Sequence, residues 1–208
     1  MMFKEFTINR YRKTIQEYKG AGYIFTGVGD NTTNPKNIVM VHDVDHDISL
    51  CDNLLSVEES TGIVSTYFLR LHAKSYNMLS RNSISIAKRI LQNGSNLGLH
   101  YEPTFKPSSM DWQEHINTEL KILSAVVGQE IEYFNLHEPT RTGTCLSSIL
   151  PSKNRCYNSP HFEGYKYLSD SSCRWREGCF SEHVGRWNQL LVLTHPIWWY
   201  NDCPAENY

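Results

Sequence analysis

The stretch Ile38-Val39-Met40-Val41-His42-Asp43-Val44-Asp45 decides the fold expected for this 208-residue chain. Its continuous apolar run, 38–41, is typical of a strand that is buried on both faces, as in a parallel sheet. The run delivers ionisable residues to its carboxyl end, where the loops of βα barrels and open α/β sheets form active sites. The segment therefore predicts a βα architecture with chemistry at the strand ends.

Similar apolar runs recur along the chain and alternate with segments of helical spacing. Strands are expected within 38–41, 63–69, 97–99, 131–136, 166–168 and 190–193, and helices within 8–18, 49–60, 83–92 and 111–127. Ser49 with Asp52 resembles a capping box for the second helix. Residues 139–163 lack a clear period and read as a long loop or short helix over the site. The alternation predicts an α/β fold with a mostly parallel sheet.

Composition narrows the class of protein. Twenty basic and twenty-two acidic residues leave a formal charge of -2, which disfavours binding to nucleic acid or to an anionic membrane. No apolar run is long enough to cross a bilayer, so the chain is expected to be cytoplasmic. Its six cysteines include no C-x-x-C pair and are expected to be free thiols in a reducing cytosol, with disulfides among the last five as the alternative. The length suits one domain.

Ionisable residues follow five of the expected strands. They are Asp43 with Asp45, His100, His137, Asp170 and His195. Any one of them is more often a helix cap or a satisfied polar group than a ligand, but five together favour a shared site. Two close carboxylates repel each other unless a cation or proton joins them. With imidazoles nearby, the donor set suits zinc, cobalt or another first-row metal better than calcium or magnesium.

These residues resemble the polysaccharide deacetylases with a NodB-homology domain, in a small WbmS-like branch found with surface-polysaccharide biosynthesis. The resemblance covers roughly residues 37–199. It rests on five blocks: 42–45 with 65–68, 97–103, 134–139, 167–175 and 191–196. It implies a distorted (β/α) barrel of about seven parallel strands. The chain would then be a single domain, 1–208, with a helical extension over 1–36.

The resemblance also implies roles for individual residues. Asp43 would be the general base and Asp45 and His100 metal ligands, while His195 would be the general acid, oriented by Asp170. The cofactor would be a divalent metal, with zinc expected and cobalt or nickel as alternatives. The reaction would remove an N-acyl group from a sugar in polysaccharide or surface-glycan biosynthesis. The expected substrate contacts are Glu102, Tyr101, Arg141, Trp175 and Trp198.

Two departures from the family pattern concern the site. Thr104 stands where the second motif has another metal-binding histidine, and His137 is the preferred replacement. Weaker candidates for that ligand are Glu102, His42 and His46. The third motif also lacks the arginine that orients the catalytic aspartate. Arg141, or an arginine of the segment Arg174-Trp175-Arg176, is expected to serve instead.

Other functions remain open at this level. A carbohydrate-binding or scaffold protein that keeps the barrel without its chemistry is credible because Thr104 replaces a ligand. A metal-dependent phosphoesterase ranks lower, because no Gly-rich phosphate loop or basic cluster is present. A serine or cysteine nucleophile ranks lower still, since no G-x-S-x-G motif occurs. Core packing is an equal alternative for Trp175 and Trp198. The sequence does not indicate an oligomeric state.

Overall fold

The apolar run identified above lies at the centre of a curled sheet. In a computed structural model, which describes residues 5–138 and 162–207, this run belongs to β2 (Asn37–Val44), and every residue of β2 is buried. Burial on both faces explains the absence of polar residues from 38 to 41. Asp43 lies near the carboxyl end of the strand, as its sequence position predicts.

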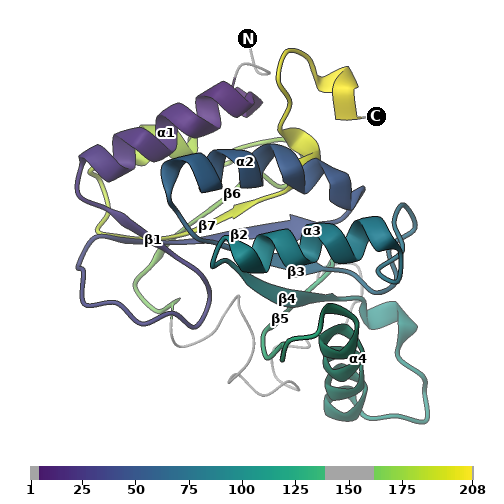
Figure 1. The fold of residues 1–208 in the computed structure, drawn as a ribbon. Helices are drawn as coiled ribbons and strands as arrows, with labels where there is room; N and C mark the ends of the chain where they lie inside the picture. Colours follow the sequence, from purple (N-terminus) through teal and green to yellow (C-terminus); the bar gives the residue numbers. More distant parts are fainter. Residues whose placement is uncertain (1–4, 139–161, 208) are drawn as a thin grey trace.

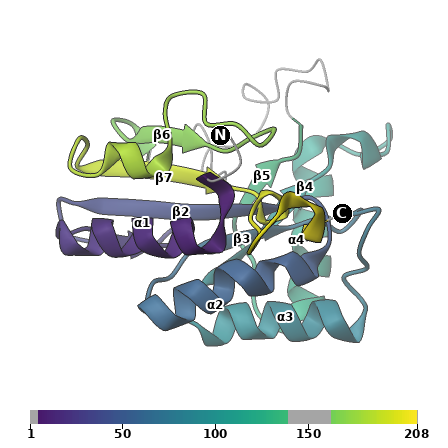
Figure 2. The ribbon, with the colours of Figure 1, turned by 90° about the horizontal axis from the view of Figure 1, so that it is seen from above.

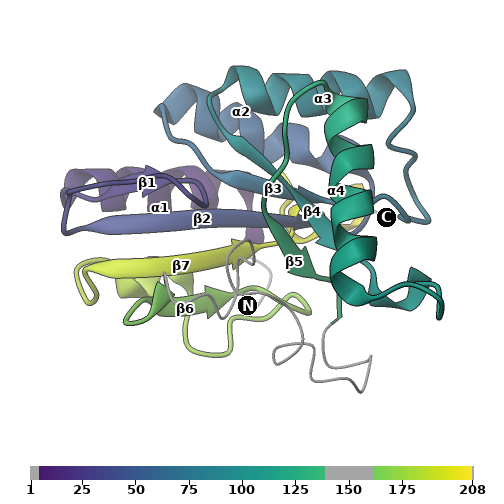
Figure 3. The ribbon, with the colours of Figure 1, turned by 90° about the horizontal axis from the view of Figure 1, so that it is seen from below.

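The described residues form a parallel sheet of seven strands in the order β5-β4-β3-β2-β7-β6, with β1 paired to β2. Figure 3 shows the sheet curling from β6 to β5 into a half-barrel. The predicted distorted α/β barrel is therefore confirmed. The other strands are β1 (Ile24–Thr26), β3 (Thr66–Leu69), β4 (Asn96–Tyr101), β5 (Phe134–Leu136), β6 (Lys166–Ser169) and β7 (Gln189–Thr194).

In the described part of the chain, four α-helices pack around this sheet. They are α1 (Ile8–Gly20), α2 (Cys51–Thr61), α3 (Arg81–Gln92) and α4 (Trp112–Val127). Helices α1, α2 and α3 lie side by side over one face of the sheet, and α4 lies beside β4 and β5 (Figures 1 and 2). None of the helices in the described part of the chain combines the length and apolar character of a membrane span.

Two local expectations need correction. The N-terminal segment is not only helical, because β1 adds a strand that pairs with β2. The start of α2 also differs from the predicted capping box of Ser49 and Asp52. Asp47 instead accepts a hydrogen bond from the Ser49 amide, at 2.9 Å, and this caps a short 3-10 turn that runs directly into α2. Since the turn already orders this backbone, α2 has no side-chain cap of its own.

The interior face of the half-barrel is apolar at its base and polar at its mouth. Its base is formed by a cluster of Val28, Val39, Val41, Phe68, Leu191 and Leu193. Because side chains two apart on a strand share a face, Asp43 continues the line of Val39 and Val41. His195 likewise continues the line of Leu191 and Leu193. The alternation of side chains along β2 and β7 therefore places the Asp43 carboxylate and the His195 imidazole next to this apolar cluster.

Candidate active site

Residues on or just after five strands, β2, β4, β5, β6 and β7, meet in one cavity of about 750 Å³. The predicted residues that line it are Asp43, Asp45, His100, His137, His195 and Trp198. The other lining residues are His46, Leu136, Glu138, Tyr167, Ser171, Ser172, Cys173, Arg176 and Leu193. The parallel sheet brings these positions together because all its strands end at the same edge.

Three side chains at the mouth form a group that could hold a metal ion. One donor atom from each of Asp45, His100 and His137 lies within 4.8 Å of the other two. The Nε2 of His100 is 3.0 Å from Asp45 Oδ1, and the Nε2 of His137 is 3.5 Å from the same oxygen. One carboxylate and two imidazoles suit zinc and other first-row metals and leave coordination positions open for water or substrate. The residues therefore fit the divalent metal that the sequence predicts.

The position of the missing histidine ligand is also explained. The hydroxyl of Thr104 donates to Glu102 Oε1 at 3.1 Å and is not part of the triad. His137 follows β5, and its backbone amide bonds to the Tyr101 carbonyl of the neighbouring strand β4. In this candidate group, the second imidazole therefore comes from the next strand instead of from the next helical turn.

The charges in the triad depend on one another. Burial opposes ionisation of Asp45, but its hydrogen bond to His100 and the charges of His100, His195 and His137 hold its pKa well below the ordinary value. Burial alone would lower the pKa of His100, yet the charges of Asp43 and Asp45 raise it. Burial and the neighbouring His100 lower the pKa of His137, which favours the neutral imidazole that a metal requires.

Glu102 and Arg70 contact residues of the triad and are not among the described residues that line the cavity. The Arg70 guanidinium binds Glu102 Oε2 at 2.5 Å and the Asp45 backbone carbonyl at 3.1 Å. The same Glu102 oxygen is 2.8 Å from His137 Nδ1, although the contact is not aligned as a hydrogen bond. Glu102 is not among the described residues that line the cavity, and its expected role as a substrate contact stays a prediction.

Asp43 is held by a residue that the sequence did not identify. The side-chain amide of Asn135, on β5, donates to Asp43 Oδ1 at 2.6 Å. The same amide contacts His100 Nδ1 through its oxygen. Asn135 is fully buried and lies two residues before His137, so strand alternation from His137 could have marked it as facing the site. Of the arginines expected in this place, Arg141 lies outside the described residues and Arg176 lines the cavity.

His195 and Asp170 form a buried pair on the other side of the cavity. The Nδ1 of His195 is 2.6 Å from Asp170 Oδ1, while the backbone amide of His195 and the indole of Trp199 both bind Oδ2. Burial opposes protonation of His195, but the Asp170 carboxylate, with Asp43 and Asp45, raises its pKa to about 9. The imidazole is therefore protonated at neutral pH, the state required of a general acid.

The expected substrate contacts divide into three groups. Trp198 lines the cavity as expected. Tyr101 is fully buried on the opposite face of β4, and its hydroxyl contacts His115 Nδ1 of α4 at 2.8 Å, so this expectation is wrong. Trp175 packs parallel to Phe6, with ring centroids 6.3 Å apart, and does not line the cavity, which is also a correction. Arg141 lies outside the described residues.

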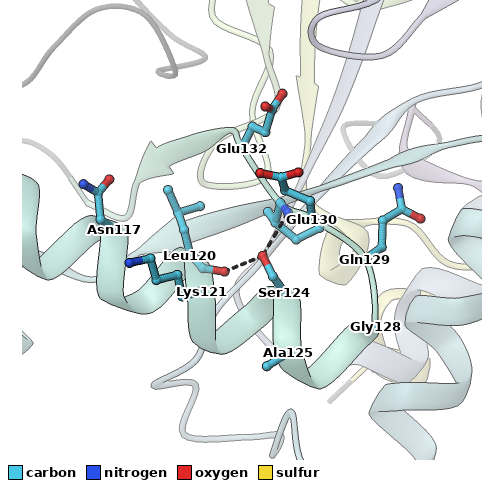
Figure 4. A pocket seen from close by; sticks show the side chains of 10 residues that line it. Asn117, Leu120, Lys121, Ser124, Ala125, Gly128, Gln129, Glu130 and Glu132 are labelled. Atoms are coloured by element: carbon cyan, nitrogen blue, oxygen red, sulfur yellow. Dashed lines mark hydrogen bonds between the residues drawn. The ribbon is translucent and has the colours of Figure 1, made fainter.

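A second cavity, of about 630 Å³, lies where α4 turns toward β5 (Figure 4). The hydroxyl of Ser124 donates to the Leu120 carbonyl at 2.7 Å and accepts from the Ile131 amide at 2.9 Å. No histidine or cysteine lines this cavity, and its carboxylates, Glu130 and Glu132, come from the turn itself. Of these two cavities, histidines line only the one at the carboxyl edge of the sheet.

The comparisons with known proteins concern the fold. No protein-family model and no curated protein sequence matches this chain. Among solved structures, it is similar to the chitin deacetylase of the fungal pathogen Colletotrichum lindemuthianum, with 15% identity and a TM-score of 0.51. That match covers 82% of this chain and 77% of the fungal chain.

Two further similar structures are bacterial. One is a mutant of a Bacillus anthracis CE4 family pseudoenzyme with restored enzymatic activity, at 13% identity and a TM-score of 0.51, covering 82% of this chain and 60% of the other. The second is a Streptococcus pyogenes deacetylase in complex with acetate, at 12% identity and a TM-score of 0.47, covering 62% and 61%. The chain thus spans less than two thirds of the length of these two proteins. The likeness to the fungal and the Bacillus structures, both with TM-scores of 0.51, shows a shared fold.

Proposed function

We propose that this chain is a metal-dependent deacetylase that removes an N-acyl group from a sugar during polysaccharide or surface-glycan biosynthesis. The observation that carries the proposal is the convergence of the triad Asp45, His100 and His137 with Asp43 and His195 in one cavity. The fold shared with a chitin deacetylase supports the same reaction class. Zinc is the metal proposed, since its preferred donors match the triad.

The cavity supports a sugar substrate. Its volume of about 750 Å³ lies within the usual range of small-molecule sites, roughly 300–1,000 Å³. Tyr167 and Trp198 line it, and aromatic side chains present flat apolar surfaces with a polar edge, which suit the faces of a sugar ring.

The proposed mechanism divides proton transfer between two residues. When bound to Asp45, His100 and His137, a divalent cation would act as a Lewis acid toward the acyl group and lower the pKa of water. Asp43 accepts a proton as water attacks the carbonyl carbon. His195 donates its proton to the nitrogen as the C–N bond breaks, which releases the amine and the carboxylic acid. Asp170 holds His195 in the required orientation and charge state.

The test is release of acetate from N-acetylated chito-oligosaccharides and from N-acetylated nucleotide sugars by the zinc-loaded protein. Asp43→Asn and His195→Ala should each lower kcat by about 10²–10⁴-fold, the usual contribution of a general base or acid. Asp52→Asn removes a carboxylate that binds Arg89 on the surface and serves as the matched control. Turnover that is unchanged in the two site variants would refute the assigned roles.

The competing hypothesis, a carbohydrate-binding protein without catalysis, predicts a different result. Such a protein would bind the oligosaccharide but release no acetate, whatever metal is supplied. The enzyme should bind close to one zinc ion per chain and lose that ion in His137→Ala. Release of phosphate from nucleotide sugars without acetate would instead favour the phosphoesterase.

A further inference from the structure

The side chain of Asn135 connects the proposed base to the proposed metal site. Its amide lies between Asp43 on β2 and His100 on β4, and donates to Asp43 Oδ1 at 2.6 Å. In the sheet, β5 is separated from β2 by β4 and β3. The contact between Asn135 and Asp43 therefore crosses the interior of the half-barrel and exists because the sheet curls.

The register shows that this contact belongs to the interior face. Asn135 is paired directly with His100 across β4 and β5. Asp43 is paired with Phe68, and Phe68 with Gly98, which lies two residues before His100 on the same face of β4. The side chains of Asn135, His100 and Asp43 are all at least nine-tenths buried. Buried polar side chains whose hydrogen bonds are all satisfied make the surrounding structure rigid and well defined.

The two ends of the amide are not interchangeable. An ionised carboxylate only accepts hydrogen bonds, so the nitrogen of Asn135 must face Asp43. The oxygen of Asn135 then faces His100 Nδ1, which must carry a proton to donate. His100 Nε2 lies 3.0 Å from Asp45 Oδ1, to which it donates a hydrogen bond in the metal-free protein. A cation held by the triad would replace that Nε2 proton, and the proton that Asn135 holds on Nδ1 leaves the Nε2 lone pair for the metal.

We propose that Asn135 is a positioning residue that sets both the orientation of Asp43 and the metal-binding tautomer of His100. The inference rests on the proposed function for the role of Asp43, but its account of His100 stands on the geometry alone. Groups that orient a metal-binding histidine in this way typically change metal affinity by about 10–100-fold when removed. A purely structural Asn135, which only joins β5 to β4, would not affect metal affinity selectively.

Two substitutions separate these possibilities. Asn135→Ala removes the contacts with Asp43 and His100, so Zn²⁺ affinity should fall by about 10–100-fold. Asn135→Asp keeps the size and an acceptor for His100 but places a second carboxylate against Asp43. Because two ionised carboxylates repel each other and neither can donate a hydrogen bond, the new side chain no longer holds Asp43 in place. We expect kcat to fall by about 10² or more while Zn²⁺ affinity is kept within about threefold of the unmodified protein.

The matched control is Asn37→Ala. Asn37 is also a buried strand asparagine, 1% exposed, but it lies at the opposite end of β2, where it accepts a hydrogen bond from Thr26. This variant should lose stability without losing Zn²⁺ affinity. Competition with a chromophoric chelator on metal-free protein gives the affinities, and thermal unfolding checks that each variant is folded.

Nitrogen NMR of the His100 ring supplies a readout that does not need turnover. In the Zn²⁺-loaded protein, the unmodified chain should carry a hydrogen-bonded proton on Nδ1 that exchanges slowly with water, and Asn135→Ala should lose this protection. A rapidly exchanging Nδ1 proton in the unmodified protein, or Zn²⁺ affinity in Asn135→Ala equal to that of Asn37→Ala, would overturn the inference. Failure of the unmodified protein to release acetate would contradict the proposed function alone, because the tautomer is measured independently.

Discussion

Replacing Glu58 with alanine should destabilise the protein strongly, although Glu58 lies outside the cavity. Its carboxylate, on α2, is fully buried. It accepts hydrogen bonds from residues of α1, β2 and β3 and from the residue just before β3. The four donors are Tyr11 and His42 on Oε1, at 2.9 and 2.7 Å, and Ser65 and Tyr67 on Oε2, at 2.9 and 3.0 Å. Four donors fill the acceptor capacity of an ionised carboxylate.

The network lies directly behind the proposed catalytic pair. His42 also contacts Thr194 of β7 at 2.6 Å, and the two residues are paired in the sheet. Asp43 and His195 each follow one of them and therefore point to the other face. Glu58 is thus connected, through His42, to both of the strand ends that carry Asp43 and His195.

The expected loss of stability in Glu58→Ala follows from these contacts. Each buried donor left without an acceptor costs about 1–3 kcal/mol, and some hydroxyl groups will find new partners. We therefore expect Glu58→Ala to lower the free energy of unfolding by about 3–5 kcal/mol, as measured for broken buried pairs. For a domain of this size, that corresponds to a fall in Tm of roughly 6–20 °C.

Urea unfolding of matched variants provides the assay. Glu59 is the next residue of α2, but it pairs with Arg89 at the surface, so Glu59→Ala should cost about 0–1 kcal/mol. In addition, Tyr67→Phe should cost about 1 kcal/mol alone and less in the Glu58→Ala background. If Glu58→Ala and Glu59→Ala differ by less than about 1 kcal/mol, the reasoning about this network is refuted.

Three further predictions concern single positions. In metal-free protein, NMR titration should give His195 a pKa near 9, and Asp170→Asn should lower that pKa. Because the folded pKa lies above the ordinary value of 6.5, the stability contributed by this pair is complete below pH 6.5. It is lost as the pH rises through about 9. Gly98→Ala should cost about 1–3 kcal/mol by chemical unfolding, because the added methyl group would overlap the buried Phe68 ring. Tyr101→Phe should cost about 1 kcal/mol and leave kcat/KM unchanged, since its hydroxyl binds within the core; a large loss of turnover would reinstate it as a substrate contact.

The elements with strong local patterns were predictable from the sequence. The apolar run of β2, the helical spacing of α1 and α4, and the glycine that ends α4 depend on near neighbours in the chain. The three-residue strand β1 was missed because it is too short to show a period. The start of α2 was misassigned because two overlapping polar residues, Asp47 and Ser49, could each begin a helix.

Within the site, the sequence determined which residues lie at the strand ends, because strand length and alternation are local properties. It therefore identified Asp43, Asp45, His100, His137, Asp170 and His195 as one group. Asp170 does not line the described cavity but is bonded to His195, and the other five line it. Their individual roles stay predictions until the variants are measured.

Only the tertiary structure decided which side chains touch. Asn135 reaches Asp43 because the sheet curls, and no spacing along the chain records that curvature. Tyr101 is buried against α4 because its side chain lies on the face of β4 that packs on that helix. Glu102, in the turn after β4, contacts His137 because that turn lies beside the end of β5. Residues far apart in sequence were brought within hydrogen-bonding distance by strand order, and strand order is a property of the whole sheet.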